Sequence, residues 1–147
     1  MSGLLDRIER AKRPPFYTLT PEAARASYAA GAEVLEPPRA ELPRVEDITV
    51  ADRPARLYAP SRDPLPVLLY LHGGGFVVGG LETHDSLCRQ LARRSGGAVV
   101  ALDYRLAPEH RFPAAQDDAW TALQRLTAHS GGLGLDPRRL AVGGHST

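Results

Sequence analysis

The sequence of 147 residues contains a single cysteine, Cys88, so no disulfide bond can form within the chain. It has no apolar run as long as a membrane-spanning helix, and its first residues, MSGLLDRIERAKRPP, are charged where a signal peptide would be apolar. Neither charge sign dominates, because 18 basic and 17 acidic residues are spread along the chain. These absences argue against a disulfide scaffold, a membrane protein and a nucleic-acid binder, and they predict a cytoplasmic location.

Motifs for metals and nucleotides are also missing. The one cysteine and the five histidines show no metal-ligand spacing. A dinucleotide-binding pattern that starts at Gly73 would need glycine where Val78 stands, and the G-K-[ST] of a P-loop does not occur. The sequence therefore implies no metal and no cofactor.

The composition that is present, 43% hydrophobic and 24% charged residues, predicts one globular domain of ordinary size. Apolar residues at helical spacing predict a short helix over residues 4–12, and Thr20-Pro21-Glu22 predicts the start of a second helix that Gly31 can end. A proline-bearing connector follows. Residues 46–60 then carry two β-rich runs around the sequence ADRP, which favours an antiparallel pair.

From residue 65 onward, apolar strands alternate with helices. The predicted strands cover residues 67–71, 98–102 and 140–142, and the predicted helices cover residues 83–94 and 113–128. This alternation predicts the α/β class, with a parallel sheet that helices cover on both faces.

The last predicted strand runs into Gly144-His145-Ser146-Thr147, which fits the first four places of the G-x-S-x-G pattern. In that pattern a sharp strand-to-helix turn exposes a serine hydroxyl, and the flanking glycines avoid steric collisions. Taken alone, such a short match more often marks a glycine turn that simply ends a strand.

A second glycine turn, His72-Gly73-Gly74-Gly75, follows the strand at residues 67–71. A serine that attacks an ester carbonyl creates an oxyanion, which backbone N–H groups stabilise well because they are already oriented. Hydrolases with an HGGG turn take one such donor from this loop and another from the residue after the nucleophile, here Thr147. The two turns together favour acyl transfer over a plain flexible bend.

With these motifs, the chain resembles the hormone-sensitive-lipase-like family of α/β-hydrolases, which are bacterial carboxylesterases and lipases with an N-terminal cap. The resemblance rests on HGGGFVVGGLETHD, DYRLAPEHRFPAA and LDPRRLAVGGHS, in the family's order and spacing. It implies the α/β-hydrolase fold, a mostly parallel sheet with helices on both faces. Residues 1–42 would be cap helices and a linker, and residues 43–147 would be the hydrolase core.

The resemblance also implies roles for individual residues. Ser146 would be the nucleophile, and the N–H groups of Gly74, Gly75 and Thr147 would form the oxyanion hole. The turn itself would be supported by His72 and Gly73. Residues 104–110 would brace the oxyanion loop without supplying catalytic groups.

Two features depart from the family pattern. His145 and Thr147 flank the serine, where the family usually has an acidic residue and an alanine. In addition, the triad order in this fold is Ser, then Asp or Glu, then His, and nothing follows Thr147. We therefore expect the chain to be the N-terminal half of an esterase, truncated at the nucleophile turn, whose base and orienting acid come from later sequence.

A base from upstream is the less favoured alternative, because each histidine has another explanation. His72 belongs to the turn, His84 to a helix start, His110 to the bracing segment and His129 to a helix end. His145 is next to the serine on a tight turn and should point away from it.

The sequence thus predicts a carboxylic ester hydrolase that acts on a small-molecule ester through an acyl-serine, and that is inactive as this chain alone. Two alternatives stay open: a non-catalytic ligand-binding or regulatory protein on the hydrolase scaffold, and a truncation artefact. The acyl and alcohol preference and the oligomeric state cannot be read from these residues.

Overall fold

The structure is a computed structural model that describes residues 14–145, and its first α-helix begins where the sequence predicts. Thr20 Oγ1 accepts a hydrogen bond from the Ala23 N–H, and proline fills the first position of α2 (Pro21–Leu35). The prediction that Gly31 ends this helix is wrong, because one internal glycine costs only about 1 kcal/mol and the helix continues through it. The helix predicted over residues 4–12 lies outside the described residues.

A short 3-10 helix, η1 (Phe16–Thr18), precedes α2, and an antiparallel hairpin follows it. Strands β1 (Arg44–Val50) and β2 (Arg53–Ala59) are joined by Ala51 and Asp52, whose φ angles of 51° and 61° fit a two-residue hairpin turn. The antiparallel pair predicted around ADRP is confirmed.

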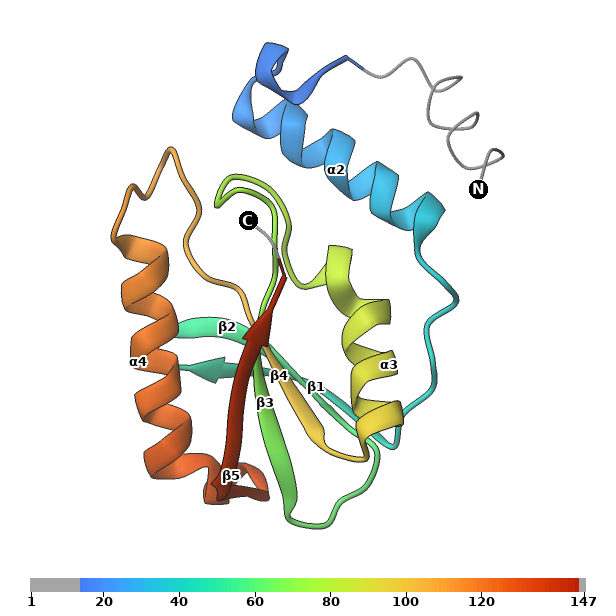
Figure 1. Ribbon diagram of the computed structural model, residues 1–147, viewed down its shortest axis with the longest axis vertical. Coiled ribbons are helices and arrows are strands. Elements are labelled where there is room, and N and C mark those ends of the chain that lie inside the picture. The colour runs from blue at the N-terminus through green and yellow to red at the C-terminus, as the bar shows by residue number, and fades with distance from the viewer. Residues whose placement is uncertain (1–13, 146–147) are drawn as a thin grey trace.

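The sheet has the strand order β1-β2-β4-β3-β5. Strand β3 (Leu65–Leu71) pairs in parallel with both β4 (Ala98–Leu102) and β5 (Leu135–Gly144), while β2 pairs antiparallel with β4. The α/β architecture is confirmed, with the predicted parallel pairing limited to the last three strands. The hairpin makes the sheet mixed (Figure 1).

Strand β5 begins five residues before the predicted strand at residues 140–142. Leu135 is buried and pairs with Leu65 after the 3-10 helix η3 (Ser130–Leu133), and the register between β3 and β5 then shifts before Val67. The sequence SGGLGLDP reads as a loop because its Gly and Pro residues mask a strand that starts at an irregularity.

Two helices cover opposite faces of the sheet (Figure 1). Helix α3 (Asp85–Ser95) follows the 3-10 helix η2 (Glu82–His84) and packs in the buried cluster of Tyr58, Tyr70, Cys88, Ala92, Val99 and Ala101. Helix α4 (Ala114–His129) contributes Ala115, Ala122 and Leu126 to the cluster on the other face. Leu87 and Trp120, which the helical period groups with the buried side chains, are exposed.

None of the helices within residues 14–145 has the length and apolarity needed to cross a membrane.

Candidate active site

The sheet register brings the two glycine motifs to the same edge. Leu71 at the end of β3 pairs with Gly144 at the end of β5, so the loop after β3 starts beside the residues that lead to Ser146. A Cβ atom on Gly144 would lie 2.4 Å from the Leu71 carbonyl oxygen, so only glycine fits there. The predicted nucleophile Ser146 and the predicted donor Thr147 lie outside the described residues.

The loop after β3 folds into a tight turn around one carbonyl. The N–H groups of Val77 and Val78 both donate to the Gly74 carbonyl oxygen, at 3.1 and 3.0 Å. Gly74 has a φ of 135°, and a Cβ atom there would lie 2.2 Å from the Val78 carbonyl oxygen. Gly75 and Phe76 both have a φ of 59°, a left-handed conformation that costs a non-glycine residue energy. The turn therefore requires glycine at position 74 for steric reasons.

The N–H groups of Gly74 and Gly75 make no hydrogen bond to any residue among 14–145. Gly74 is half-buried and Gly75 is exposed, so these donors can be reached from outside. Successive free N–H groups in a turn of this kind form a concave site that suits an anion. The geometry is therefore compatible with stabilising an oxyanion.

His72 and Tyr104 support the turn from beneath. His72 is buried, and its Nδ1–H donates to the Gly73 carbonyl at 2.9 Å, while its ring stacks on Tyr104 with centroids 4.3 Å apart. The Tyr104 hydroxyl donates to the His72 carbonyl. Burial lowers the pKa of His72, so its ring is neutral at neutral pH and supports the turn by hydrogen bonding and stacking.

Residues 104–110 run alongside the loop and contact it. The Ala107 N–H donates to the Phe76 carbonyl at 2.8 Å. This segment is in turn fixed to α4, because Asp118 accepts hydrogen bonds from the backbone N–H and the guanidinium of Arg105. These contacts are those that a bracing segment would make.

His145 points toward β3 and η2. The Tyr70 hydroxyl lies 2.7 Å from His145 Nδ1, and His84 Nε2 lies 3.4 Å from His145 Nε2. Burial, followed by the neighbouring His72, lowers the pKa of His84 to about 4. The rings of Tyr70, His84 and His145 therefore lie together where β5 ends, an arrangement that the sequence did not predict.

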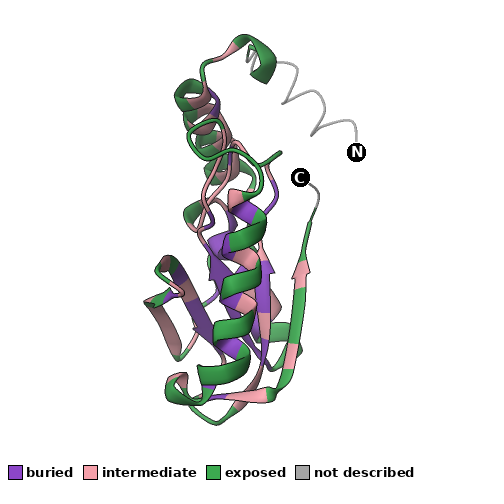
Figure 2. Cartoon of the chain, turned by 90° about the vertical axis from the view of Figure 1, so that its left-hand side faces the viewer, coloured by how far each residue is buried: buried purple, intermediate pink, exposed green. Residues whose placement is uncertain are grey.

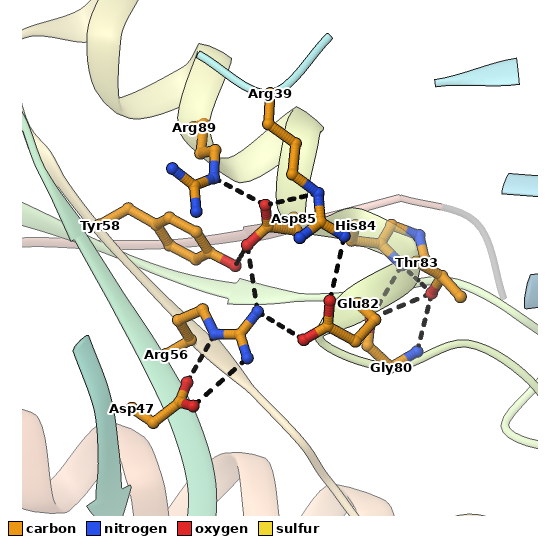
Figure 3. Close-up of polar contacts among 10 residues, drawn as sticks. All are labelled: Arg39, Asp47, Arg56, Tyr58, Gly80, Glu82, Thr83, His84, Asp85 and Arg89. Carbon is orange, nitrogen blue, oxygen red and sulfur yellow. Dashed lines mark hydrogen bonds and ion pairs between the residues drawn. The ribbon is translucent and has the colours of Figure 1, made fainter. Parts of the chain in front are cut away.

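A buried carboxylate anchors the end of the loop segment. Asp85 is fully buried and binds Arg89 Nε at 2.6 Å, the Tyr58 hydroxyl at 2.9 Å, Arg56 Nη1 at 3.1 Å and Arg39 Nε at 3.2 Å (Figure 3). Burial alone would raise the pKa of Asp85, but these hydrogen bonds outweigh it and leave the pKa below its ordinary value. Asp85 is the last residue of the HGGGFVVGGLETHD motif, but the sequence alone did not indicate a role for it.

Between the glycine turn and Asp85, the Thr83 side chain forms a local turn by hydrogen bonding to the backbone of Gly80. Its hydroxyl accepts from the Gly80 N–H and donates to the Gly80 carbonyl, both at 3.0 Å (Figure 3). The loop segment is thus held at both ends, by Tyr104 at one end and by Thr83 and Asp85 at the other.

A depression of about 390 Å³ lies beside the loop, with Phe76, Tyr104, Ala119, Val142 and His145 in its largely apolar lining. A larger depression, of about 490 Å³, lies between α2 and η2 and contains none of the loop's glycines. Within residues 14–145, no three side chains of metal-ligating type gather at one point.

The chain is similar to known proteins. A family described as having the alpha/beta hydrolase fold matches residues 68–147. Ethyl acetate hydrolase of Pseudomonas putida is 40% identical over 141 residues, which is 90% of this chain and 44% of that protein. A solved ester hydrolase from the metagenome of Lake Arreo, complexed with a derivative of bipyridine phosphonate, is 40% identical with a TM-score of 0.87. The match covers 98% of this chain and 48% of that chain.

A receptor also matches. The gibberellin receptor GID1 of Oryza sativa subsp. japonica is 50% identical over 68 residues, which is 45% of this chain and 19% of the receptor. The chain spans less than half the length of each of these three proteins.

Proposed function

The chain belongs to the alpha/beta hydrolase fold family, and we propose that the protein is a carboxylic ester hydrolase that acts on small-molecule esters through an acyl-serine. The observation that carries this proposal is the pair of free N–H groups on Gly74 and Gly75, next to a β5 end that leads into Ser146. The names of two similar proteins, an ethyl acetate hydrolase and an ester hydrolase, support the same chemistry.

In the proposed reaction, Ser146 attacks the ester carbonyl carbon, and the carbonyl oxygen becomes an oxyanion. The N–H groups of Gly74, Gly75 and Thr147 donate to this oxygen, with His72 and Gly73 supporting the turn. Collapse of the tetrahedral intermediate expels the alcohol and leaves the acyl-serine, which water then hydrolyses.

The reaction also needs a base that takes the serine proton. Among residues 14–145, His72 Nδ1 is engaged with the Gly73 carbonyl, and His145 is engaged with Tyr70 and His84. In this fold the acid and the histidine follow the serine in chain order. The proposal therefore assigns neither role to a described histidine.

The proposal includes the division of the chain into a cap and a core. Helix α2 lies over the carboxyl ends of β3 and β5 (Figure 1), where it can cover a bound ester. We assign residues 1–42 to the cap and its linker and residues 43–147 to the core. A cytoplasmic location and the absence of a nucleic-acid partner belong to the same proposal.

Hydrolysis of p-nitrophenyl acetate tests the proposed function in a protein that carries residues 1–147 together with the acid and the histidine expected after Ser146, because we expect residues 1–147 alone to be inactive. We expect turnover that Ser146→Ala abolishes and that Ser95→Ala, a substitution of an exposed serine at the end of α3, leaves unchanged. Turnover that persists in Ser146→Ala would rule out the proposed nucleophile.

The similarity to a gibberellin receptor favours one second candidate, a ligand-binding protein on the same scaffold. The two candidates differ in one observable. Saturable binding of an ester without release of alcohol, in wild type and in Ser146→Ala alike, would favour the binding protein.

A further inference from the structure

Arg25 on α2 reaches the glycine loop with its guanidinium. Its Nε–H donates to the Val77 carbonyl at 2.7 Å, and its Nη2 donates to the Ala107 carbonyl at 2.8 Å. Nη1 and Nη2 also bind the two carboxylate oxygens of Glu109, at 2.9 and 2.7 Å. One side chain of α2 therefore ties the loop to the segment that braces it.

Together with the bracing segment, Arg25 holds successive backbone carbonyls of the turn. The Ala107 N–H holds the Phe76 carbonyl, and Arg25 holds the next carbonyl, that of Val77, together with the carbonyl of Ala107 itself. Phe76 stands in a left-handed conformation that persists only when surrounding contacts enforce it. The carbonyls held in this way directly follow the free N–H groups of Gly74 and Gly75.

The pair of Arg25 and Glu109 is partly exposed, with 29% and 46% of the side-chain surface accessible. Exposed ion pairs add little to the stability of a whole fold, so its effect should be local. Hydrogen bonding from Arg25 lowers the pKa of Glu109 to about 2, which keeps the pair ionised at neutral pH. A lysine has no planar fork and could not reach the carboxylate and both carbonyls together.

The same face of α2 makes a second contact with this region. Tyr28, one turn after Arg25, stacks on His84 with ring centroids 6.3 Å apart. Arg25 meets the loop at Val77 and Tyr28 meets it near η2, so the position of α2 is linked to both ends of the loop.

We propose that Arg25 is a positioning residue, which holds the turn closed through the Val77 carbonyl and so keeps the Gly74 and Gly75 N–H groups aimed outward. Helix α2 is thereby coupled to the oxyanion loop. The expected effect of Arg25 on kcat rests on the proposed function, whereas its expected effect on the conformation of the loop does not.

Hydrogen–deuterium exchange of the Val77 and Val78 amides tests the coupling directly, because both amides are protected only by the Gly74 carbonyl. In Arg25→Met we expect these two amides to exchange about tenfold faster, with the amides of β4 unchanged. In the same variant, kcat for p-nitrophenyl acetate should fall about tenfold with KM nearly constant.

The matched control is Arg139→Met. Arg139 also binds a carboxylate, Asp136, and a backbone carbonyl, that of Pro64, but it lies on β5 away from the loop. It should leave the exchange of Val77 and Val78 unchanged.

If Arg25→Met does not fold, Arg25→Lys keeps the charge and should give a smaller acceleration confined to the same two amides. Wild-type exchange in either variant would overturn the proposal, and so would an equal acceleration throughout β4, because that would mean a general loss of stability. If the wild-type protein that carries the later acid and histidine does not hydrolyse the ester, the proposed function fails, and the exchange rates still decide the role of Arg25.

Discussion

Strands β4 and β5 lie on either side of β3 and both pair with it in parallel, yet their surroundings differ (Figure 2). All five residues of β4 are buried, because β2 pairs with its other edge and helices cover both of its faces. Strand β5 forms an edge of the described sheet, and Arg138, Arg139, Ala141 and Val142 are exposed. The sequences AVVAL of β4 (residues 98–102) and LAV of β5 (residues 140–142) are equally apolar. The difference in burial therefore comes from the neighbouring elements, and apolar sequence alone does not determine it.

The same asymmetry extends to the loop that leaves β3. On the β4 side, the loop is held by Tyr104 and Ala107, which follow β4, and by Arg25. On the β5 side, His145, the last described residue before the proposed nucleophile, contacts Tyr70 and His84. The glycine loop is therefore held by the buried half of the sheet, whereas the segment that leads to the proposed nucleophile continues from the edge strand.

The largest effect is expected at the glycine loop. In Gly74→Val, the new Cβ would meet the Val78 carbonyl oxygen at 2.2 Å and a φ of 135°, so the turn must open and its N–H groups must move. Loss of one oxyanion donor typically lowers kcat by about 10² to 10³. Steady-state hydrolysis of p-nitrophenyl acetate measures this loss.

Gly75→Ala is the matched control, because a Cβ atom at Gly75 meets nothing within 4 Å. Its φ of 59° leaves a strain of only about 1 kcal/mol, so kcat should fall far less than in Gly74→Val. Equal kcat values in wild type and a folded Gly74→Val would mean that the glycines serve only to bend the chain.

The next largest effect contrasts two aspartates. Asp85 is fully buried among arginines and a tyrosine near the centre of the sheet, whereas Asp136 at the start of β5 binds the exposed Arg138 and Arg139. Asp85→Asn should lower the free energy of unfolding by about 3 kcal/mol, because it breaks a buried ionic network. Asp136→Asn should lower it much less, because solvent screens the pairs that Asp136 makes with the exposed Arg138 and Arg139. Urea unfolding of both variants measures the difference, and equal costs would remove the contrast between the two regions.

Local features of this protein could be predicted from its sequence. The three parallel strands, the hairpin and the HGGG turn are encoded by apolar runs and by glycines within a few residues, and all of them are present in the fold. The glycine motifs could be placed at one edge because parallel strands align their carboxyl ends.

Contacts between distant residues could not be predicted. Arg25 meets Glu109 across 84 positions, and nothing in one sequence selects this pair among 18 basic and 17 acidic residues. The partners of Asp85 and His145 were missed for the same reason. The early start of β5 was missed because Pro137 and the preceding glycines are typical of loops.

A smaller effect depends on pH. Burial lowers the pKa of His84 to about 4 in the folded protein, so below the ordinary value of 6.5 the unfolded chain takes up a proton that the folded chain does not. The stability that the folded protein has with a neutral His84 is fully present above pH 6.5 and is lost as the pH falls toward 4. Between pH 6.5 and pH 5, the free energy of unfolding should fall by about 2 kcal/mol.

Urea unfolding at a series of pH values measures this slope. His84→Gln should flatten it, and His129→Gln, at the exposed end of α4, should retain it because His84 is still present. A slope that is the same in wild type and His84→Gln would assign the pH dependence to other groups.

The smallest effect is expected at Val142, and it is measured by making the same substitution in both strands that flank β3. Val142 on β5 is 50% exposed, whereas Val100 on β4 is fully buried. Val142→Thr replaces a methyl group by a hydroxyl that water can still reach, so the free energy of unfolding should change by less than about 0.5 kcal/mol. Val100→Thr places the same hydroxyl in the apolar cluster with Leu69 and Leu126, where an unpaired polar group costs about 1 to 3 kcal/mol. Thermal and urea unfolding of the two variants compare the strands directly. A cost at Val142 equal to that at Val100 would mean that the outer face of β5 is covered in the folded protein, and the asymmetry between the two strands would then not hold.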